Sequence, residues 1–224
     1  MKNKEYRKNE QKDFVLVNML IILYLSEAIN QIANIENMMP SIIITKIVDF
    51  SFVSSIVYLL IFIIDSLIPI ELKEWIIYLF TGTPGETIFT KIKNNKIKDI
   101  RFSKENVLEK YKDIYEKIEN INCDKEKKRI ENESWYSIYL CYKELGSIET
   151  SQNDFLLARD LCITSVVIFA VYLLSSLVFK LLDFKIIILL LLITEIIITK
   201  IASYFKAKRF VTNVIAIDVN TKNK

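Results

Sequence analysis

Apolar residues are concentrated in four blocks along the chain, and charged residues lie between and outside these blocks. Leu161–Phe179 contains no charged residue, and Ile186–Ile198 contains only Glu195. A run of about 18 or more apolar residues is typical of a transmembrane helix. The blocks predict four spans, at about residues 14–33, 42–64, 161–179 and 186–205. This pattern excludes a purely soluble protein, and the short connection at 180–185 predicts that the last two spans form an antiparallel hairpin.

The segment between the second and third spans is the one polar stretch large enough to fold on its own. Apolar residues recur at helical spacing from Ser103 to Ile121, and Ser103 is a suitable N-cap. A second helix is expected over about residues 129–145. Residues 87–102 fit either a short basic helix or a hairpin across Asn94–Asn95, and their periodicity does not choose between the two. The predicted fold is all-α: a four-span membrane protein with a small helical module between spans 2 and 3.

These elements divide the chain into five parts. They are an N-terminal tail (1–13), a first transmembrane hairpin (14–70), a helical domain (71–158), a second transmembrane hairpin (159–206) and a C-terminal tail (207–224). Lys and Arg are enriched in cytoplasmic loops, so their distribution predicts the orientation. Apart from the sixteen between the second and third spans, from Lys73 through Arg159, eleven lie on the side of the termini and three, Lys46, Lys180 and Lys185, on the other. We therefore expect a multi-pass protein of the bacterial inner membrane, with both termini and the helical domain in the cytoplasm.

Composition excludes several kinds of chemistry. The 224 residues include no His, and the three Cys have no close pairing. Catalysis by His, a His-ligated metal, a zinc site and a disulfide framework are therefore not expected. Gly82-Thr-Pro-Gly85 does not match the phosphate-binding loop pattern, and the chain has no nucleophile elbow and no HExxH motif. A net charge of +3 does not imply binding to long nucleic acid. We expect neither enzymatic activity nor a cofactor or metal.

Glu195 lies near the middle of the fourth predicted span. A charged side chain at the centre of a span costs about 2.5–3.5 kcal/mol on insertion scales, so it needs a partner, a wet cavity or a proton. Glu195 is either a pore-lining or gating carboxylate or a hydrogen-bonded group that fixes helix packing. Glu27, Asn30 and Gln31 share one helical face at the far end of the first span. They form either the vestibule of a pore or a part of the helix that has left the bilayer.

A basic cluster lies in the helical domain, within fourteen residues: Lys91, Lys93, Lys96, Lys98, Arg101 and Lys104. It suits contact with anionic lipid, which contributes about 1 kcal/mol per Lys or Arg, or recognition of a nucleotide or another phosphate ligand. Arg159 and Asp160 lie where the helical domain joins the third span. If the helical domain senses a ligand, this junction is where movement would pass to the spans.

Two short motifs are Gly82-Thr-Pro-Gly85-Glu-Thr-Ile-Phe89, after the second span, and Asn153-Asp-Phe-Leu-Leu-Ala-Arg159, before the third. In these motifs the chain resembles bacterial four-span proteins that have a Pro/Thr segment and a Phe-Leu-Leu run at the same places. The layout resembles small membrane effectors of bacterial antiphage defence, of the CBASS-like, Hailong-like and type III CRISPR-linked kinds. These effectors open or disrupt the inner membrane when a nucleotide signal binds. The resemblance implies a homo-oligomeric channel or pore that contacts membrane lipids and responds to a nucleotide second messenger. The alternative is a non-conducting membrane scaffold or regulatory subunit.

Overall fold

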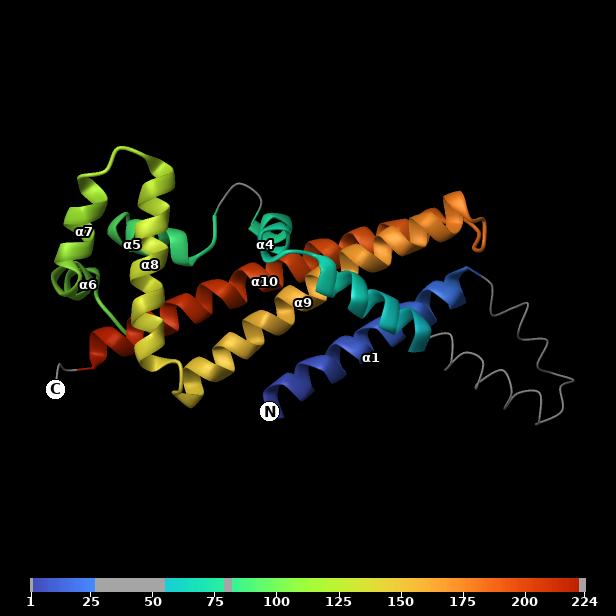
Figure 1. Ribbon diagram of the computed structural model, residues 1–224, viewed down its shortest axis with the longest axis horizontal. Coiled ribbons are helices and arrows are strands. Elements are labelled where there is room, and N and C mark those ends of the chain that lie inside the picture. The colour runs from blue at the N-terminus through green and yellow to red at the C-terminus, as the bar shows by residue number, and fades with distance from the viewer. Residues whose placement is uncertain (1, 27–54, 79–81, 222–224) are drawn as a thin grey trace, which may run out of the picture. The chain divides into compact units, whose positions relative to one another are not determined.

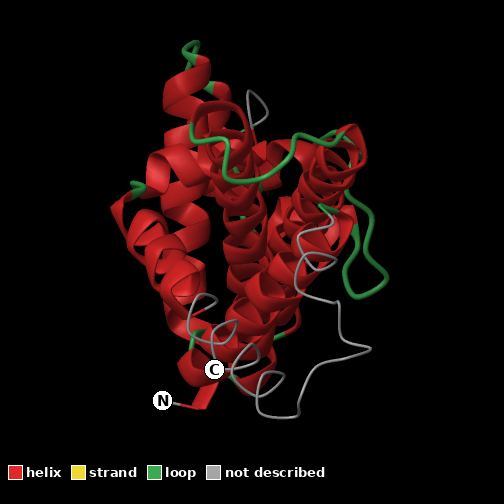
Figure 2. Ribbon diagram, turned by 90° about the vertical axis from the view of Figure 1, so that its right-hand side faces the viewer, coloured by secondary structure: helices red, strands yellow, loops and turns green. Residues whose placement is uncertain are grey.

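The computed structural model describes residues 2–26, 55–78 and 82–221. Within these ranges the secondary structure is helical, apart from an isolated bridge between Asp99 and Phe102. Figure 2 shows helices joined by loops, without strands, in the described part of the chain. The predicted all-α fold class is confirmed for these residues.

The described helices are labelled in Figure 1 where there is room. In chain order they are α1 (Lys2–Leu25), a helix over Ser55–Leu67, α4 (Ile70–Tyr78), the 3₁₀ turn η2 (Gly85–Thr87), α5 (Ile88–Lys93), α6 (Lys104–Lys110), α7 (Lys112–Glu119), α8 (Asp124–Tyr142), α9 (Gly146–Leu173), the π-helical turn η3 (Leu174–Val178) and α10 (Ile186–Asn220).

Two of these helices are long and apolar enough to cross a membrane: α9 with η3, over Gly146–Val178, and α10. The helix over Ser55–Leu67 and α4 reach this level of hydropathy only as a pair, bent by 95° where they join. Pro69 lies at that break and lacks the backbone N–H that a continuous helix would use. The described residues therefore hold two candidate spans, or three if the bent pair is one span. Residues 27–54, with parts of the first two predicted spans, lie outside the described ranges.

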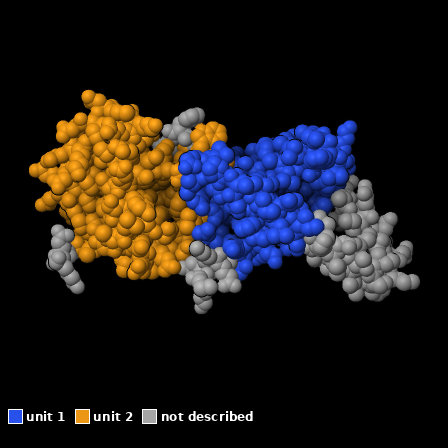
Figure 3. Space-filling model, viewed as in Figure 1, with its two compact units in different colours: residues 1–73, 157–201 blue, residues 74–156, 202–224 orange. Residues whose placement is uncertain are grey.

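The chain forms two compact units, coloured separately in Figure 3. Unit 1 comprises residues 1–73 and 157–201, and unit 2 comprises residues 74–156 and 202–224. The boundaries between the units fall inside α4, α9 and α10, so each of these three helices belongs to both units.

The N-terminal and C-terminal tails predicted from the sequence are largely parts of helices in the structure. Residues 2–13 belong to α1, and residues 207–220 continue α10. The reason for the second extension is an apolar stripe at helical spacing: Phe210, Val211, Val214 and Ile215 are buried in the core of unit 2. Residues 207–220 therefore form an amphipathic helical segment whose apolar side is buried.

The core of unit 2 is built around aromatic side chains. Phe89 of α5 meets the rings of Tyr111 and Tyr115 edge-on, with centroids 5.3 and 5.9 Å away. Trp135 of α8 meets Phe210 of α10 edge-on at 5.4 Å. Such aromatic pairs stabilise by about 0.5–1.5 kcal/mol beyond the area they bury. The C-terminal part of α10 is therefore a core element of unit 2.

Asp218 lies near the end of α10, and polar contacts to its carboxylate also hold this helix in unit 2. The hydroxyl groups of Tyr111 and Tyr142 donate to it, the latter at 2.8 Å, and Lys110 pairs with it at 3.1 Å. Burial and the neighbouring carboxylate raise the pKa of the Tyr111 hydroxyl, which stays protonated and keeps donating. These bonds connect α10 to the α6–α7 junction and to α8.

Several local predictions are settled by the helix ends in unit 2. Ser103 is the N-cap of α6, and its Oγ accepts a bond from the backbone N–H of Asn106 at 3.1 Å. The expected helix after Ser103 is interrupted at Tyr111, where α6 ends and α7 begins. The open choice at residues 87–102 is decided in favour of a short helix, α5, followed by a turn in which Asn95 has a φ of 55°.

In unit 1, α9 and α10 form the expected antiparallel hairpin. The hydroxyl of Tyr172 accepts from the backbone N–H of Lys185 at 2.9 Å and donates to its carbonyl oxygen at 3.2 Å. This side chain closes the connection between the two helices. Further along the hairpin, Ser165 of α9 lies opposite Glu195 of α10.

Candidate functional site

A cavity of about 970 Å³ opens within unit 2 and is lined by both charged and hydroxyl-bearing side chains. We call it the basic pocket. Its walls come from the segment between α5 and α6 (Ile97, Lys98, Asp99, Arg101), the first turns of α9 (Gly146, Ser147, Thr150, Ser151, Asp154) and α10 (Phe205, Lys208, Arg209, Thr212, Asn213). All three walls belong to unit 2.

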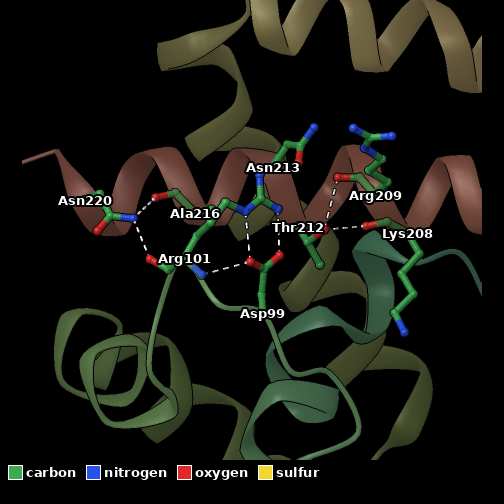
Figure 4. Close-up of polar contacts among 8 residues, drawn as sticks. All are labelled: Asp99, Arg101, Lys208, Arg209, Thr212, Asn213, Ala216 and Asn220. Atoms are coloured by element: carbon green, nitrogen blue, oxygen red, sulfur yellow. Dashed lines mark hydrogen bonds and ion pairs between the residues drawn. The ribbon is translucent and has the colours of Figure 1, made fainter.

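Arg101 is held in one orientation by two partners, as Figure 4 shows. Its Nε and Nη2 donate to the two carboxylate oxygens of Asp99 at 2.8 and 2.6 Å, and Nη1 donates to the side-chain oxygen of Asn213 at 2.7 Å. The pKa of Asp99 is lowered, mainly by the hydrogen bond from Arg101. Asn220 also donates to the carbonyl oxygen of Arg101 at 2.8 Å. The segment around Arg101 is thereby attached to α10 at two points.

The other cations of the basic pocket have no such partner. Lys98, Lys208 and Arg209 make no ion pair with any residue that the structure describes. The two carboxylates of the pocket are both neutralised, Asp99 by Arg101 and Asp154 by Lys206 at 2.6 Å. The pocket therefore has a net positive charge that is free to act on a ligand.

The start of α9 adds to this field. Gly146, Ser147 and Thr150 of its first turns line the pocket. The first N–H groups of a helix have no partner inside the helix, and its N-terminal end has a partial positive charge. Hydroxyl groups at Ser147 and Thr150 extend the set of polar groups that an anion could contact. Cations, hydroxyl groups and a helix start are thus combined in one cavity.

A second, smaller hollow of about 170 Å³ adjoins the basic pocket and shares Ile97 and Lys208 with it. We call it the side hollow. Lys91, Lys96 and Tyr204 are among its lining residues. The pKa of Lys91 is lowered, because its partial burial outweighs the opposite effect of the nearby Glu131 carboxylate. Lys208 of α10 faces both hollows.

The structure separates the six members of the predicted basic cluster. Lys98 and Arg101 line the basic pocket, whereas Lys91 and Lys96 line the side hollow. Lys93 forms an ion pair with Glu119 of α7, and Lys104 begins α6 and lines neither hollow. The sequence pattern had suggested one continuous cationic segment, but the turn after α5 directs its members to different surfaces.

Sequence reasoning missed Lys208 and Arg209. Both follow the fourth predicted span, in a region expected to be a tail. The signal that could have found them is the apolar stripe that begins at Phe210, because it indicates a helix packed on one side. Because the apolar stripe packs into the core, basic residues next to it in the helix are held in a fixed position.

Glu195 is bonded within its own chain, in unit 1. Its Oε1 accepts from the side-chain amide of Asn18 in α1 at 2.8 Å and from the hydroxyl of Ser165 in α9 at 3.3 Å. The other residues predicted to line a pore, Glu27, Asn30 and Gln31, lie outside the described residues. Glu195 thus connects three helices of unit 1.

The junction residues Arg159 and Asp160 form an ion pair with each other, at 2.9 Å. Asp160 also pairs with Arg7 of α1 at 3.2 Å, and one turn further Gln11 donates to Thr164 of α9 at 2.8 Å. Sequence reasoning missed Arg7, Gln11 and Asn18, because it treated residues 1–13 as a tail and Asn18 as part of an apolar block. Together they form a polar face of α1 that binds the hairpin.

No group of three or more His, Cys, Asp or Glu among the described residues could hold a metal ion. A scan against protein-family models found no match to the chain, and searches of curated proteins and of solved structures found none either.

Proposed function

We propose that this protein is a membrane channel or pore that assembles from several copies and is opened by its helical unit 2. The observation that supports it is the course of α9 and α10. Each is a continuous helix that lines the basic pocket at one end and contributes an apolar segment long enough to cross a membrane. A ligand that moves the pocket walls would therefore displace the membrane helices themselves.

The path from the pocket to the spans is short. Asp154 lines the pocket, and Arg159 and Asp160 follow between one and two turns later in the same helix. Because Asp160 also binds Arg7, a movement of α9 at this level acts on α1 as well. These contacts support the coupling role expected for Arg159 and Asp160, because movement at this level could pass through both α9 and α1.

The topology belongs to the same proposal: four spans in the bacterial inner membrane, with both termini and unit 2 in the cytoplasm. A homo-oligomer is required because one subunit offers few polar groups to line a conduit. Several of the polar side chains that the structure describes in unit 1 form hydrogen bonds with one another, as in the Gln11–Thr164 and Asn18–Glu195 pairs. The biological setting that we propose is antiviral defence, in line with the resemblance of the layout.

A non-conducting scaffold or regulatory subunit is the second candidate. One observation favours it: Glu195 has two hydrogen-bond donors in its own chain, so its presence in a span is accounted for without a pore.

Flux measurements separate the two candidates. The purified full-length chain is reconstituted in liposomes loaded with a K⁺-sensitive dye, and the same chain is induced in bacteria with a membrane-potential dye present. A channel produces K⁺ flux and depolarisation that depend on the amount of protein. Correct insertion and assembly without flux in liposomes and without depolarisation in cells would favour the scaffold.

A further inference from the structure

We propose that the basic pocket and the side hollow form one binding site for a small phosphorylated ligand that carries at least two phosphate groups. This inference deepens the proposed function, on which it rests for its consequence in the membrane. The binding itself can be tested separately.

The arrangement of the cations supports two phosphate positions. Lys98 and Arg209 line the basic pocket, Lys91 and Lys96 line the side hollow, and Lys208 lines both. Charges spread over two adjoining hollows suit a ligand whose own charges are separated. A single small anion would leave one of the two sets of cations unpaired.

The balance of charge favours phosphate over a cationic or neutral ligand. Asp99 and Asp154, the acidic residues of the pocket, are each bound to a basic side chain, so they do not repel an anion strongly. Arg209 can form two parallel hydrogen bonds with one phosphate group, and lysine side chains bind phosphate as point charges.

The apolar and aromatic residues that line the two hollows indicate that the ligand also has an organic part. Ile97 lies where the two hollows meet, and Phe205 lines the basic pocket with 61% of its surface exposed. Tyr204 lines the side hollow. Apolar and aromatic surface next to cations suits the carbon skeleton of a phosphate ester. A volume of about 970 Å³ is at the upper end of the usual range for small-molecule pockets, roughly 300–1,000 Å³.

The test measures binding to the full-length chain in nanodiscs of phosphatidylcholine, which has no net charge. Isothermal titration with pyrophosphate and with ATP is compared with titration of inorganic phosphate, at two salt concentrations. We expect the first two to bind more tightly than inorganic phosphate and to weaken as salt rises. The proposal would be overturned if the three soluble probes bound equally tightly or not at all and if the lipid titration described below also showed no binding.

Variants assign the binding to the site. Lys98→Gln with Lys208→Gln is expected to weaken ATP binding by about tenfold for each charge removed. Lys208→Arg keeps the charge and is expected to retain most of the affinity. The matched control is Lys112→Gln with Lys117→Gln, which removes two charges from α7, outside both hollows. A loss as large in the control as in the site variant would overturn the proposal.

A lipid headgroup could supply the same chemistry as a soluble phosphate ester. A second set of titrations therefore uses vesicles and nanodiscs with cardiolipin, a lipid whose headgroup carries two phosphate groups. Lipid binding that depends on Lys98 and Lys208, in the absence of soluble-probe binding, would support the phosphate site with lipid as its source. Binding of neither class that depends on these two residues overturns the site.

The outcomes distinguish this inference from the proposed function. If ATP or pyrophosphate binds through Lys98 and Lys208 but never changes the liposome flux, the site is supported and the gated channel is contradicted. If the flux responds to these probes equally in the wild type and in the Lys98→Gln, Lys208→Gln variant, the channel is supported and the site is contradicted.

Discussion

The side-chain amide of Asn18 in α1 donates a hydrogen bond of 2.8 Å to Oε1 of Glu195 in α10. The two residues are 177 positions apart, and Ser165 of α9 donates to the same oxygen. One carboxyl group therefore links the first helix of the chain to both helices of the apolar hairpin. This relationship makes Glu195 both a structural centre of unit 1 and the residue whose substitution best tests the pore.

Glu195→Gln and Glu195→Leu are expected to differ. The glutamine retains a carbonyl oxygen that accepts from Asn18, so thermal unfolding in detergent should change little. In a channel it should lower cation preference, because it removes the charge. The leucine loses both bonds, at about 1–2 kcal/mol or less per interhelical bond. Paired thermal-unfolding and liposome-flux measurements on both variants test this. Unchanged flux and selectivity in the glutamine variant would assign Glu195 to helix packing alone.

Asp160→Asn is expected to weaken coupling rather than binding. It removes the charge that pairs with Arg7 and Arg159, whereas the basic pocket keeps all of its cations. Titration with ATP should give a nearly unchanged affinity, and ATP-dependent flux should fall. Glu133→Gln, an exposed position of α8, serves as the control. Equal responses of the two variants in the flux assay would contradict the coupling role.

The Asp99–Arg101 pair is expected to make the stability of unit 2 depend on pH. The hydrogen bond from Arg101 lowers the pKa of Asp99 in the folded state, compared with about 3.9 in an unfolded chain. The stabilisation is therefore present above pH 4 and is lost as the pH falls through the folded-state pKa. The pair is partly exposed, so the effect should be about 1 kcal/mol or less.

Melting temperatures of the wild type and Asp99→Asn between pH 3 and pH 7 test this linkage. The wild type should be the more stable at pH 7, and the difference should shrink below about pH 4. Glu109→Gln, at an exposed position of α6, controls for the loss of a carboxylate. A difference that stays constant across this range would show that the ion pair does not contribute.

Gly85→Ala is expected to destabilise unit 2. A Cβ atom at Gly85 would come within 2.7 Å of the Asn132 side-chain oxygen and 3.2 Å of the Trp135 ring. Overpacking of this kind typically costs about 1–3 kcal/mol. Gly146→Ala is the matched control, because a Cβ atom there meets nothing within 4 Å. Denaturant unfolding followed by tryptophan fluorescence should show a lower midpoint for Gly85→Ala only.

The native cysteines report the topology. Cys123 and Cys141 are exposed in unit 2, so an impermeant thiol reagent should fail to label them in intact cells and should label them after permeabilisation. In a chain with Cys123→Ser and Cys141→Ser, an added Lys180→Cys substitution should be labelled in intact cells. Labelling of Cys123 in intact cells would overturn the proposed orientation.

Much of the helical fold could be predicted from the sequence, because helix formation depends on local spacing. The uncharged run Leu161–Phe179 predicted the apolar part of α9, and Ser103 predicted the start of α6 through its own side chain. Such features need only neighbouring residues, so a sequence pattern is sufficient to find them.

The candidate site depends on contacts between distant parts of the chain, which only the tertiary structure decided. Arg101 meets Asn213 because the stripe from Phe210 to Ile215 packs into the core of unit 2 and presents the polar side of α10 to the segment after α5. The same packing places Lys208 and Arg209 beside Lys98. Likewise, Glu195 was recognisable as a group in need of a partner, because an intramembrane charge is costly wherever it occurs. That the partner is Asn18 follows from the packing of α1 on the hairpin, which no local pattern encodes.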